Sequence, residues 1–236
     1  MKNIIRLPVE HYLDKIRNNE PFSFSRFGDG EVMCCFPGGY LTENCDGSRF
    51  LPELKKPMMQ ILKNQYPYYH CLLDCSFDLN GDKFRKLLEE TCPDMDFYDG
   101  EVWQKLSFDE RIGELIEAIN PYNPCFVGGS HLKNVKYMYG LDSMRFIETP
   151  SRDSFLQYDG IFDEIMAMYK TGCRMFLFST GYTTKIIIDN LYPYIGEFAT
   201  LLDAGSLFDC YVGKLSRDGM RYKGKDFFQY ATSFKL

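Results

Sequence analysis

Short apolar segments alternate with helix-like segments along most of the chain. In the second half the apolar runs PCFVGGS, RFIETPS, CRMFLFSTG and ATLLDAGS each end in the small or hydroxyl-bearing residues that often precede a helix. In the first half FSFSRF and YYHCLLDC have the same character and are interpreted as strands. This alternation predicts an α/β fold, with a Rossmann-like and mostly parallel sheet covered by helices on both faces.

Helices are expected where apolar residues recur at helical spacing. Tyr12 and Ile16 indicate a first helix over residues 9–17, which ends before Pro21 because proline does not fit in the interior of a helix. In the middle region, residues 50–120, helix-like segments end near Lys63 and span 82–90 and 108–119. We therefore expect the middle region to form a helical insertion, and we expect it to be the variable part that recognises an acceptor.

The length and composition indicate one globular domain over residues 1–236. A chain of 236 residues with 45% hydrophobic and 25% charged residues buries a sizeable core without cross-links. We find no internal repeat and no linker. The nine cysteines are odd in number and contain no CxxC spacing, which favours reduced thiols over a disulfide framework or a zinc site.

The charge balance excludes one class of partner. A net charge of -6 gives no broad cationic face, so we expect no nucleic acid as a partner. A basic C-terminal segment, which offers a local anion site or more commonly a solvated surface, contains Lys214, Arg217, Arg221, Lys223 and Lys225. The N-terminus lacks the apolar core of a signal peptide, and no apolar run reaches the roughly 18 residues of a transmembrane segment. We therefore expect a location in the cytoplasm, or at most on a membrane surface.

Five turns that follow predicted strands are rich in Gly, Ser, Thr or Asp. They span residues 26–31, 128–130, 149–151, 179–184 and 203–206. The carboxyl ends of parallel strands lie on one edge of a sheet, so these turns are expected to converge there. Small residues let backbone amides approach an anion, and helix N-termini add unpaired N–H groups, so a phosphate-bearing ligand is expected. The same residues are also ordinary helix caps and turn formers, which explains any single turn.

The segment SRFGDGE carries the clearest chemistry. Asp29 and Glu31 are two positions apart, so in an extended segment their carboxylates project from one side and share a divalent cation. Gly28 and Gly30 leave room for a phosphate to approach. Ligation by oxygen alone favours Mg²⁺ or Mn²⁺. Arg26 is expected to bind phosphate with its guanidinium.

These residues resemble a known family, the GT-D fold glycosyltransferases of bacterial and viral surface-glycan assembly. FSFSRFGDGE resembles the signature strand and loop of the family, with its Asp-x-Glu metal motif at Asp29 and Glu31. Further similar segments follow in the same order and bring the coverage to about three quarters of the chain: FVGGSHL, ETPSRDSF, FSTGYTTKIIIDNL and LLDAGSLFDCYVGK. Some members carry Gly-His where this chain has Gly205 and Ser206, so no role of that histidine is carried over.

The resemblance implies transfer of a sugar from a nucleoside diphosphate donor, most simply a UDP-sugar, to a hydroxyl of a glycan or glycoprotein acceptor. A divalent cation, Mn²⁺ or Mg²⁺, would sit on Asp29 and Glu31 and stabilise the leaving diphosphate. The acceptor hydroxyl benefits from a carboxylate base, for which Asp203 and Asp209 are candidates, although both also suit a capping role. The residues expected to contact the donor are Arg26, Gly28, Gly30, Gly129, Ser130, His131, Ser151, Thr180, Gly181, Thr183, Thr184 and Ser206.

Two alternatives stay open on the sequence alone. A Rossmann-type methyltransferase dependent on S-adenosylmethionine also has a Gly-rich first loop, but it needs no metal motif and usually places an acidic residue after the second strand. A non-catalytic nucleotide-sugar-binding protein of a glycan-assembly complex would share the donor site without turnover. The middle region matches the family poorly, so the acceptor is not identified.

Overall fold

A computed structural model describes residues 4–36, 42–44, 46–78, 80–137, 141, 143–214 and 216. Within these residues eight strands form one sheet in the order β1-β4-β3-β2-β8-β7-β5-β6. Every neighbouring pair is parallel. The fold class predicted from the alternating pattern is therefore confirmed. The strands are β1 (Ile4–Ile5), β2 (Ser23–Phe27), β3 (Tyr69–Leu72), β4 (Phe97–Asp99), β5 (Cys125–Gly128), β6 (Arg145–Glu148), β7 (Met175–Ser179) and β8 (Thr200–Asp203).

The six strands expected from the sequence are all present. The first helix, α1, spans Val9–Arg17 as predicted, and α3 (Lys55–Asn64) and α4 (Gly81–Thr91) lie where helix-like segments were expected. The helix expected over 108–119 begins later, at Ile112, and a separate helix ends at Phe108, because Glu110 adopts a φ of 62° that a right-handed helix cannot contain. The remaining helices are α2 (Asp29–Cys35), α5 (Val102–Phe108), α6 (Ile112–Ile119), α7 (Tyr158–Lys170) and α8 (Thr183–Ile195).

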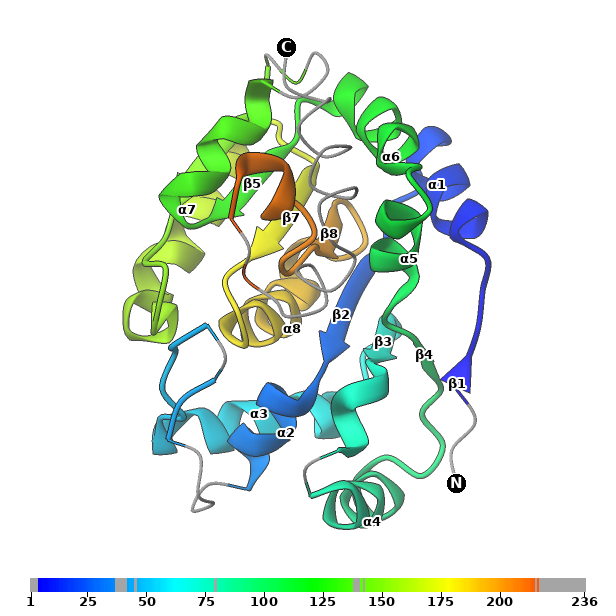
Figure 1. The fold of residues 1–236 in the computed structure, drawn as a ribbon, viewed down its shortest axis with the longest axis vertical. Coiled ribbons are helices and arrows are strands. Elements are labelled where there is room, and N and C mark those ends of the chain that lie inside the picture. Colours follow the sequence, from blue (N-terminus) through cyan, green and yellow to red (C-terminus); the bar gives the residue numbers. More distant parts are fainter. Residues whose placement is uncertain are drawn as a thin grey trace.

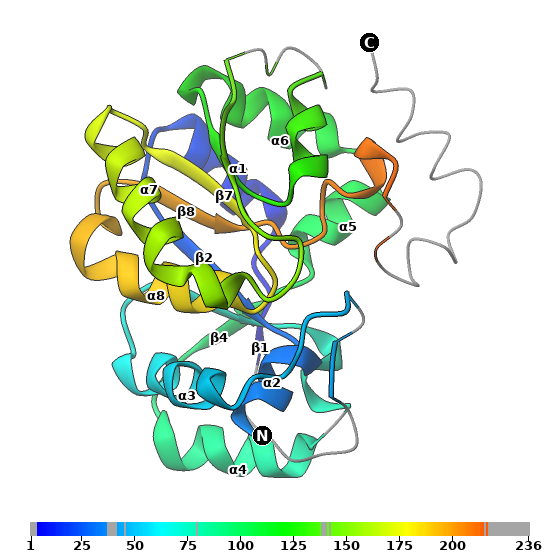
Figure 2. The same ribbon diagram turned by 90° about the vertical axis from the view of Figure 1, so that its left-hand side faces the viewer.

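The middle region contributes more than helices. It supplies α3 to α6 as expected, and it also adds β3 and β4 to the common sheet. The strand β4 has only three residues, and β1 at the edge has two, so neither is long enough to show a period. In Figures 1 and 2, α2, α3 and α4 gather at one end of the molecule.

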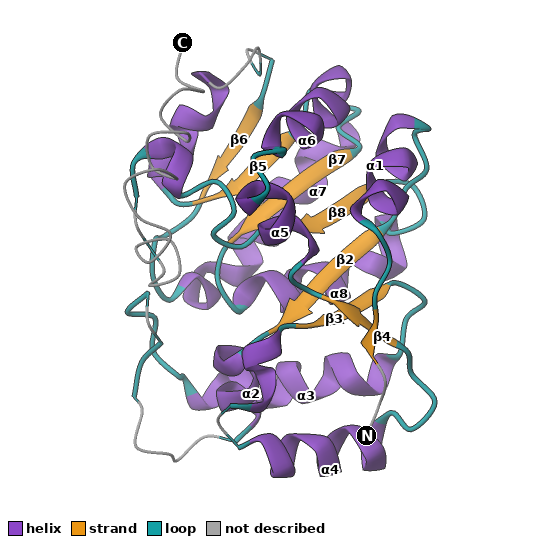
Figure 3. Cartoon of the chain, turned by 45° about the vertical axis from the view of Figure 1, so that its right-hand side comes forward, coloured by secondary structure: helices purple, strands orange, loops and turns teal. Residues whose placement is uncertain are grey.

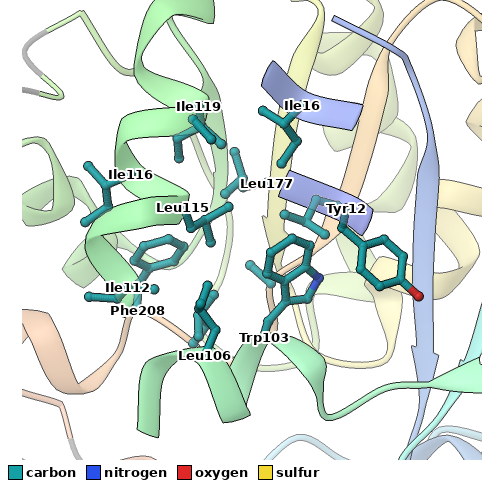
Figure 4. Packing of buried hydrophobic residues seen from close by; sticks show 14 of the residues in the cluster. Tyr12, Ile16, Trp103, Leu106, Ile112, Leu115, Ile116, Ile119, Leu177 and Phe208 are labelled. Carbon is teal, nitrogen blue, oxygen red and sulfur yellow. The ribbon is translucent and has the colours of Figure 1, made fainter. Parts of the chain in front are cut away.

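Helices cover both faces of the sheet, and Figure 3 shows the strands lying side by side between them. On one face α1, α5 and α6 pack around Trp103, Tyr12 and Leu115, all of which are at most 1% exposed (Figure 4). On the other face α7 and α8 pack on the strands. Trp103 is thus a core residue, as is usual for a large ring.

The chain leaves neighbouring strands toward opposite faces at the centre of the sheet. After β2 it enters α2, which packs with α3 and Ile186 of α8. After β8 it turns to the other face, where Leu207 and Phe208 join the core around Trp103. In open α/β sheets, ligands bind in the crevice outside the carboxyl ends of the strands at such a switch point. Within the described residues, no helix has the length and apolar character to cross a bilayer.

Candidate functional site

The turns after β2 and β8 meet at the switch point, because these two strands pair directly through Phe24 and Leu202. Four ionisable side chains from four elements are buried there. Arg26 comes from β2 and Asp203 from β8, while Glu31 and Lys185 lie in the first turns of α2 and α8. Two positive and two negative groups thus form one buried charge network, defined here as Arg26, Glu31, Lys185 and Asp203.

Asp203 is the centre of this network and is 0% exposed. Its Oδ2 accepts hydrogen bonds from the backbone N–H of Arg26 at 3.1 Å and from Nζ of Lys185 at 3.1 Å. Its Oδ1 lies 3.4 Å from Nη2 of Arg26. Burial alone would raise the pKa of Asp203, but the two cations outweigh it and hold the pKa below the usual value. The geometry therefore gives Asp203 the role of a counter-ion rather than that of the expected base.

Lys185 is a residue that the sequence reasoning missed. Its Nζ lies 2.8 Å from Oε1 of Glu31 and 3.3 Å from the carbonyl oxygen of Gly181. Burial opposes the charge, but Asp203 and Glu31 keep the pKa of Lys185 above its usual value. The available signal was a lysine inside the apolar helical run TTKIIIDNL, because a lysine is almost never fully buried without a partner.

The acidic pair of SRFGDGE does not lie in an extended segment. Asp29 is the first residue of α2 and Glu31 the third, and side chains two positions apart on a helix do not face each other. Glu31 points inward, where its Oε2 accepts a hydrogen bond from the N–H of Gly28 at 2.8 Å. The expected arrangement, with both carboxylates on one side of an extended chain, is therefore wrong, because β2 ends at Phe27 and α2 begins at Asp29.

Asp29 remains at the edge of the crevice and is half-buried. Its Oδ1 accepts the N–H of Gly30 at 2.9 Å and lies 3.7 Å from Sγ of Cys75. Among the described residues, no group of three or more His, Cys, Asp or Glu side chains is placed to hold a metal ion. A magnesium or manganese ion can be held by one carboxylate together with ligand phosphates. Asp29 fits that requirement, whereas both oxygens of Glu31 already have partners.

Arg26 is 5% exposed, and its Nε and Nη1 are buried without a partner among the described residues. Such unsatisfied donors are uncommon in native proteins and suit an anion that is absent from the structure. Gly205, at φ +51°, lies so close to Arg26 that a Cβ there would overlap Nη2. A glycine at this position therefore adopts the left-handed conformation without strain and leaves space for the guanidinium of Arg26.

Three of the four expected donor residues in the turn after β7 use their side chains internally. Oγ1 of Thr184 accepts the N–H of Thr180 at 3.1 Å, and the two hydroxyls lie 2.8 Å apart. Oγ1 of Thr183 lies 3.0 Å from the hydroxyl of Ser154. All three threonines are buried, so they shape the turn and do not offer free hydroxyls. Gly181 has a φ of +60°, and Asp46 lies near it.

The turn after β5 joins the turn after β8 through a side-chain contact. Nε2 of His131 lies 3.0 Å from Oδ1 of Asp209 and 3.5 Å from Nζ of Lys214. Gly129 lies against the ring of His131 and close to Ser151. The structure thus brings together expected residues from β5, β6 and β8. Ser130 and Ser151 are exposed, and Ser206 is half-buried. Of the basic C-terminal residues, Arg217, Arg221, Lys223 and Lys225 lie outside the described residues.

Glu101 is a second residue that the sequence reasoning missed. It follows β4 and is half-buried, and its carboxylate accepts a hydrogen bond from the backbone N–H of Asp74. Burial raises the pKa of Glu101 and the nearby Arg26 lowers it only in part. Because β4 was itself not predicted, nothing in the sequence placed this residue at the carboxyl edge.

A cavity of about 670 Å³ lies at the other edge of the sheet. It is lined by residues at the amino ends of β2, β3 and β4, among them Ser23, Tyr69 and Tyr98. It is therefore remote from the switch point and from the charge network.

Comparisons with known proteins place the fold. No protein-family model and no curated protein sequence matches the chain. Among solved structures, a glycosyltransferase (DUF1792) from Streptococcus sanguinis superimposes with a TM-score of 0.64 at 19% identity, over 87% of this chain and 82% of that chain. A conserved domain of unknown function 1792 that has a distinct glycosyltransferase fold gives a TM-score of 0.59 at 21% identity, over 86% and 79%. A selenomethionine form of a DUF1792 domain gives 0.63 at 19% identity over the same shares. This chain has the fold of those proteins.

Proposed function

We propose that the chain is a glycosyltransferase that uses a nucleoside diphosphate sugar, most simply a UDP-sugar. The observation that carries the proposal is the pair of buried cations, Arg26 and Lys185, at the switch point beside the edge carboxylate Asp29. A crevice of this kind is where α/β folds bind nucleotides. The similar structures, one called a new glycosyltransferase and one a distinct glycosyltransferase fold, support the same activity.

The donor diphosphate is proposed to lie over the turns after β2, β7 and β8. Nε and Nη1 of Arg26 are buried without a partner in the part of the chain that the structure describes, and a guanidinium binds phosphate oxygens in a fork. The first turn of α8 adds the positive end of a helix that is 13 residues long. These turns carry glycines, which have no side chain between the backbone and the phosphates: Gly28, Gly30, Gly181 and Gly205. A metal ion, when bound, supplies a Lewis acid for the leaving phosphate, and Asp29 is the residue that would hold it.

The proton of the acceptor hydroxyl needs a base near the same crevice. Asp203 is already paired with two cations, so we assign the role to Asp209 together with His131. A carboxylate that accepts from one ring nitrogen fixes the tautomer of an imidazole. Glu101 is the competing residue, because it comes from the middle region that we expect to recognise the acceptor glycan or glycoprotein.

The test measures binding and turnover of nucleotide sugars. Asp29→Asn should lower sugar release from the preferred donor in Mn²⁺ by at least 100-fold, since it removes the edge carboxylate. Asp159→Asn, at an exposed carboxylate in the first turn of α7, is the matched control and should keep full turnover. Unchanged turnover in Asp29→Asn would contradict the site. Binding of S-adenosylmethionine in preference to any nucleotide sugar would favour a methyltransferase, and donor binding without turnover would favour a sensor.

A further inference from the structure

The ammonium of Lys185 sits inside a shell of three oxygens. Its Nζ is 2.8 Å from Oε1 of Glu31, 3.1 Å from Oδ2 of Asp203 and 3.3 Å from the carbonyl oxygen of Gly181. The side chain of Lys185 is 6% exposed, and those of Glu31 and Asp203 are 10% and 0% exposed. A buried ammonium held by two carboxylates and a carbonyl has the same kind of surroundings that a bound cation needs.

The charges of the network are already balanced. Lys185 and Arg26 supply two positive charges, and Glu31 and Asp203 supply two negative ones. Each oxygen of Glu31 has a hydrogen-bond partner, one on Lys185 and one on the N–H of Gly28. If Glu31 turned toward a metal ion, it would lose both hydrogen bonds, and the buried ammonium of Lys185 would lose one of its two carboxylate partners. Breaking a buried ion pair in this way is strongly unfavourable.

We propose that Lys185 is a built-in cation of the donor site, which holds Glu31 and Asp203 and leaves Asp29 as the single carboxylate for a divalent ion. The proposal rests on the proposed function, because it concerns the same crevice. A single carboxylate would bind Mn²⁺ only weakly, so Asp29 would hold the ion together with the phosphates of the donor. The acidic pair of SRFGDGE is thereby divided into an edge residue, Asp29, and a structural residue, Glu31.

The test measures the affinity of the protein for Mn²⁺ alone, from the electron paramagnetic resonance signal of the free ion. Asp29→Asn should weaken Mn²⁺ binding at least tenfold. Glu31→Gln, which keeps the volume and can still accept a hydrogen bond, should change it less than twofold. Equal losses in both variants would show that the two carboxylates bind the ion together and would overturn the proposal.

A second variant tests the role of Lys185 directly. Lys185→Met removes the ammonium but keeps a long apolar stem, so Glu31 and Asp203 become free to bind a cation. Mn²⁺ affinity should rise at least tenfold, and the added Glu31→Gln change should abolish the gain. An unchanged affinity in folded Lys185→Met would contradict the proposal.

The unaltered protein provides a measurement if either variant fails to fold. UDP should tighten Mn²⁺ binding at least tenfold, because the phosphates complete a site that has one carboxylate. Tight binding of Mn²⁺ without UDP would overturn the proposal. These measurements are made without a sugar donor, so a failure of glycosyl transfer would leave them intact and would count against the proposed function alone.

Discussion

Burial determines what each titratable side chain can do at the residue scale. Asp203 was expected to act as a base, but it lies between two cations that favour its charged form, and a base must be free to take up a proton. Asp29 and Asp203 have the same side chain and lie near the same crevice. Asp29 is half-buried and can contact a ligand, whereas Asp203 is fully buried and stabilises the fold through its ion pairs.

His70 gives a prediction for stability. It is 2% exposed on β3, and burial lowers its pKa from 6.5 to about 4, although the carbonyl of Tyr66 accepts its Nε2–H at 2.9 Å. Below pH 6.5 the unfolded chain gains a proton that the folded chain does not, so stability falls as the pH drops from 6.5 to about 4. The loss contributed by this histidine approaches about 3 kcal/mol at pH 4, since one pKa unit is worth about 1.4 kcal/mol.

The measurement compares urea unfolding of the native protein and of His70→Phe at several pH values. The variant keeps an aromatic ring beside Tyr68 but cannot titrate. Above pH 7 its free energy of unfolding should differ from that of the native protein by a constant amount. Below pH 6.5 the native protein should lose stability relative to the variant as the pH falls. Parallel curves over the whole range would exclude this effect.

Sequence reasoning found part of the site at this scale and missed the rest for a clear reason. Arg26 and Asp29 lie at the switch point because the first is near the end of a predicted strand and the second follows that strand. Lys185 was missed because it occupies an apolar helical run, and its two carboxylate partners, Glu31 and Asp203, are more than 15 positions away in the chain. The tertiary packing brings such distant residues together, so their contact could not be predicted from a single sequence.

At the scale of elements, the largest correction concerns a boundary between strand and helix. The tetrapeptide after β2 was expected to be an extended loop, whereas α2 begins at Asp29 and Glu31 caps its own helix through Gly28. Glycines on both sides of an aspartate favour a turn. A glutamate at the third helical position can accept the N–H of the N-cap residue, which is half of a capping box, but Gly28 has no side chain to complete the box. The sequence therefore carried only half of the signal for a helix at this point.

The turn after β8 gives a prediction at this scale. In Gly205→Ala the new Cβ would overlap Nη2 of Arg26, and the residue would keep an unfavourable φ of +51°. Arg26 would have to leave Asp203, so we expect a loss of more than about 2 kcal/mol in unfolding free energy, because a buried charge loses its partner. Thermal shift by UDP should also disappear.

Two other glycines separate the causes. Gly172→Ala has the same backbone penalty at φ +96° but meets no atom within 4 Å, so it should cost only about 1 kcal/mol. Gly160→Ala, in the open on α7, should raise stability by about 0.5 to 1 kcal/mol. If Gly205→Ala were no worse than Gly172→Ala, the contact with Arg26 would not be important for stability.

At the scale of the whole molecule, the alternating pattern determined the fold class but not the order of the strands. The sheet was predicted because six apolar runs were separated by helical segments. On one side β2 pairs with β3, the next strand along the chain, but on the other side it pairs with β8, the last strand in the described part of the chain. The second pairing depends on contacts between residues 177 positions apart, such as that of Arg26 with Asp203. This long-range pairing creates the switch point, and the site could not be assembled without it.

The same topology separates the two edges of the sheet, and hydrogen exchange can test which edge binds the donor. We expect UDP with Mn²⁺ to slow amide exchange in residues 28–32 and 204–209, which are far apart in sequence but adjacent at the carboxyl ends of β2 and β8. Residues 66–70 and 94–98, beside the aromatic cavity at the amino edge, should exchange at an unchanged rate. Protection confined to the second pair of segments would move the nucleotide to that cavity and would leave the buried charge network with a purely structural role.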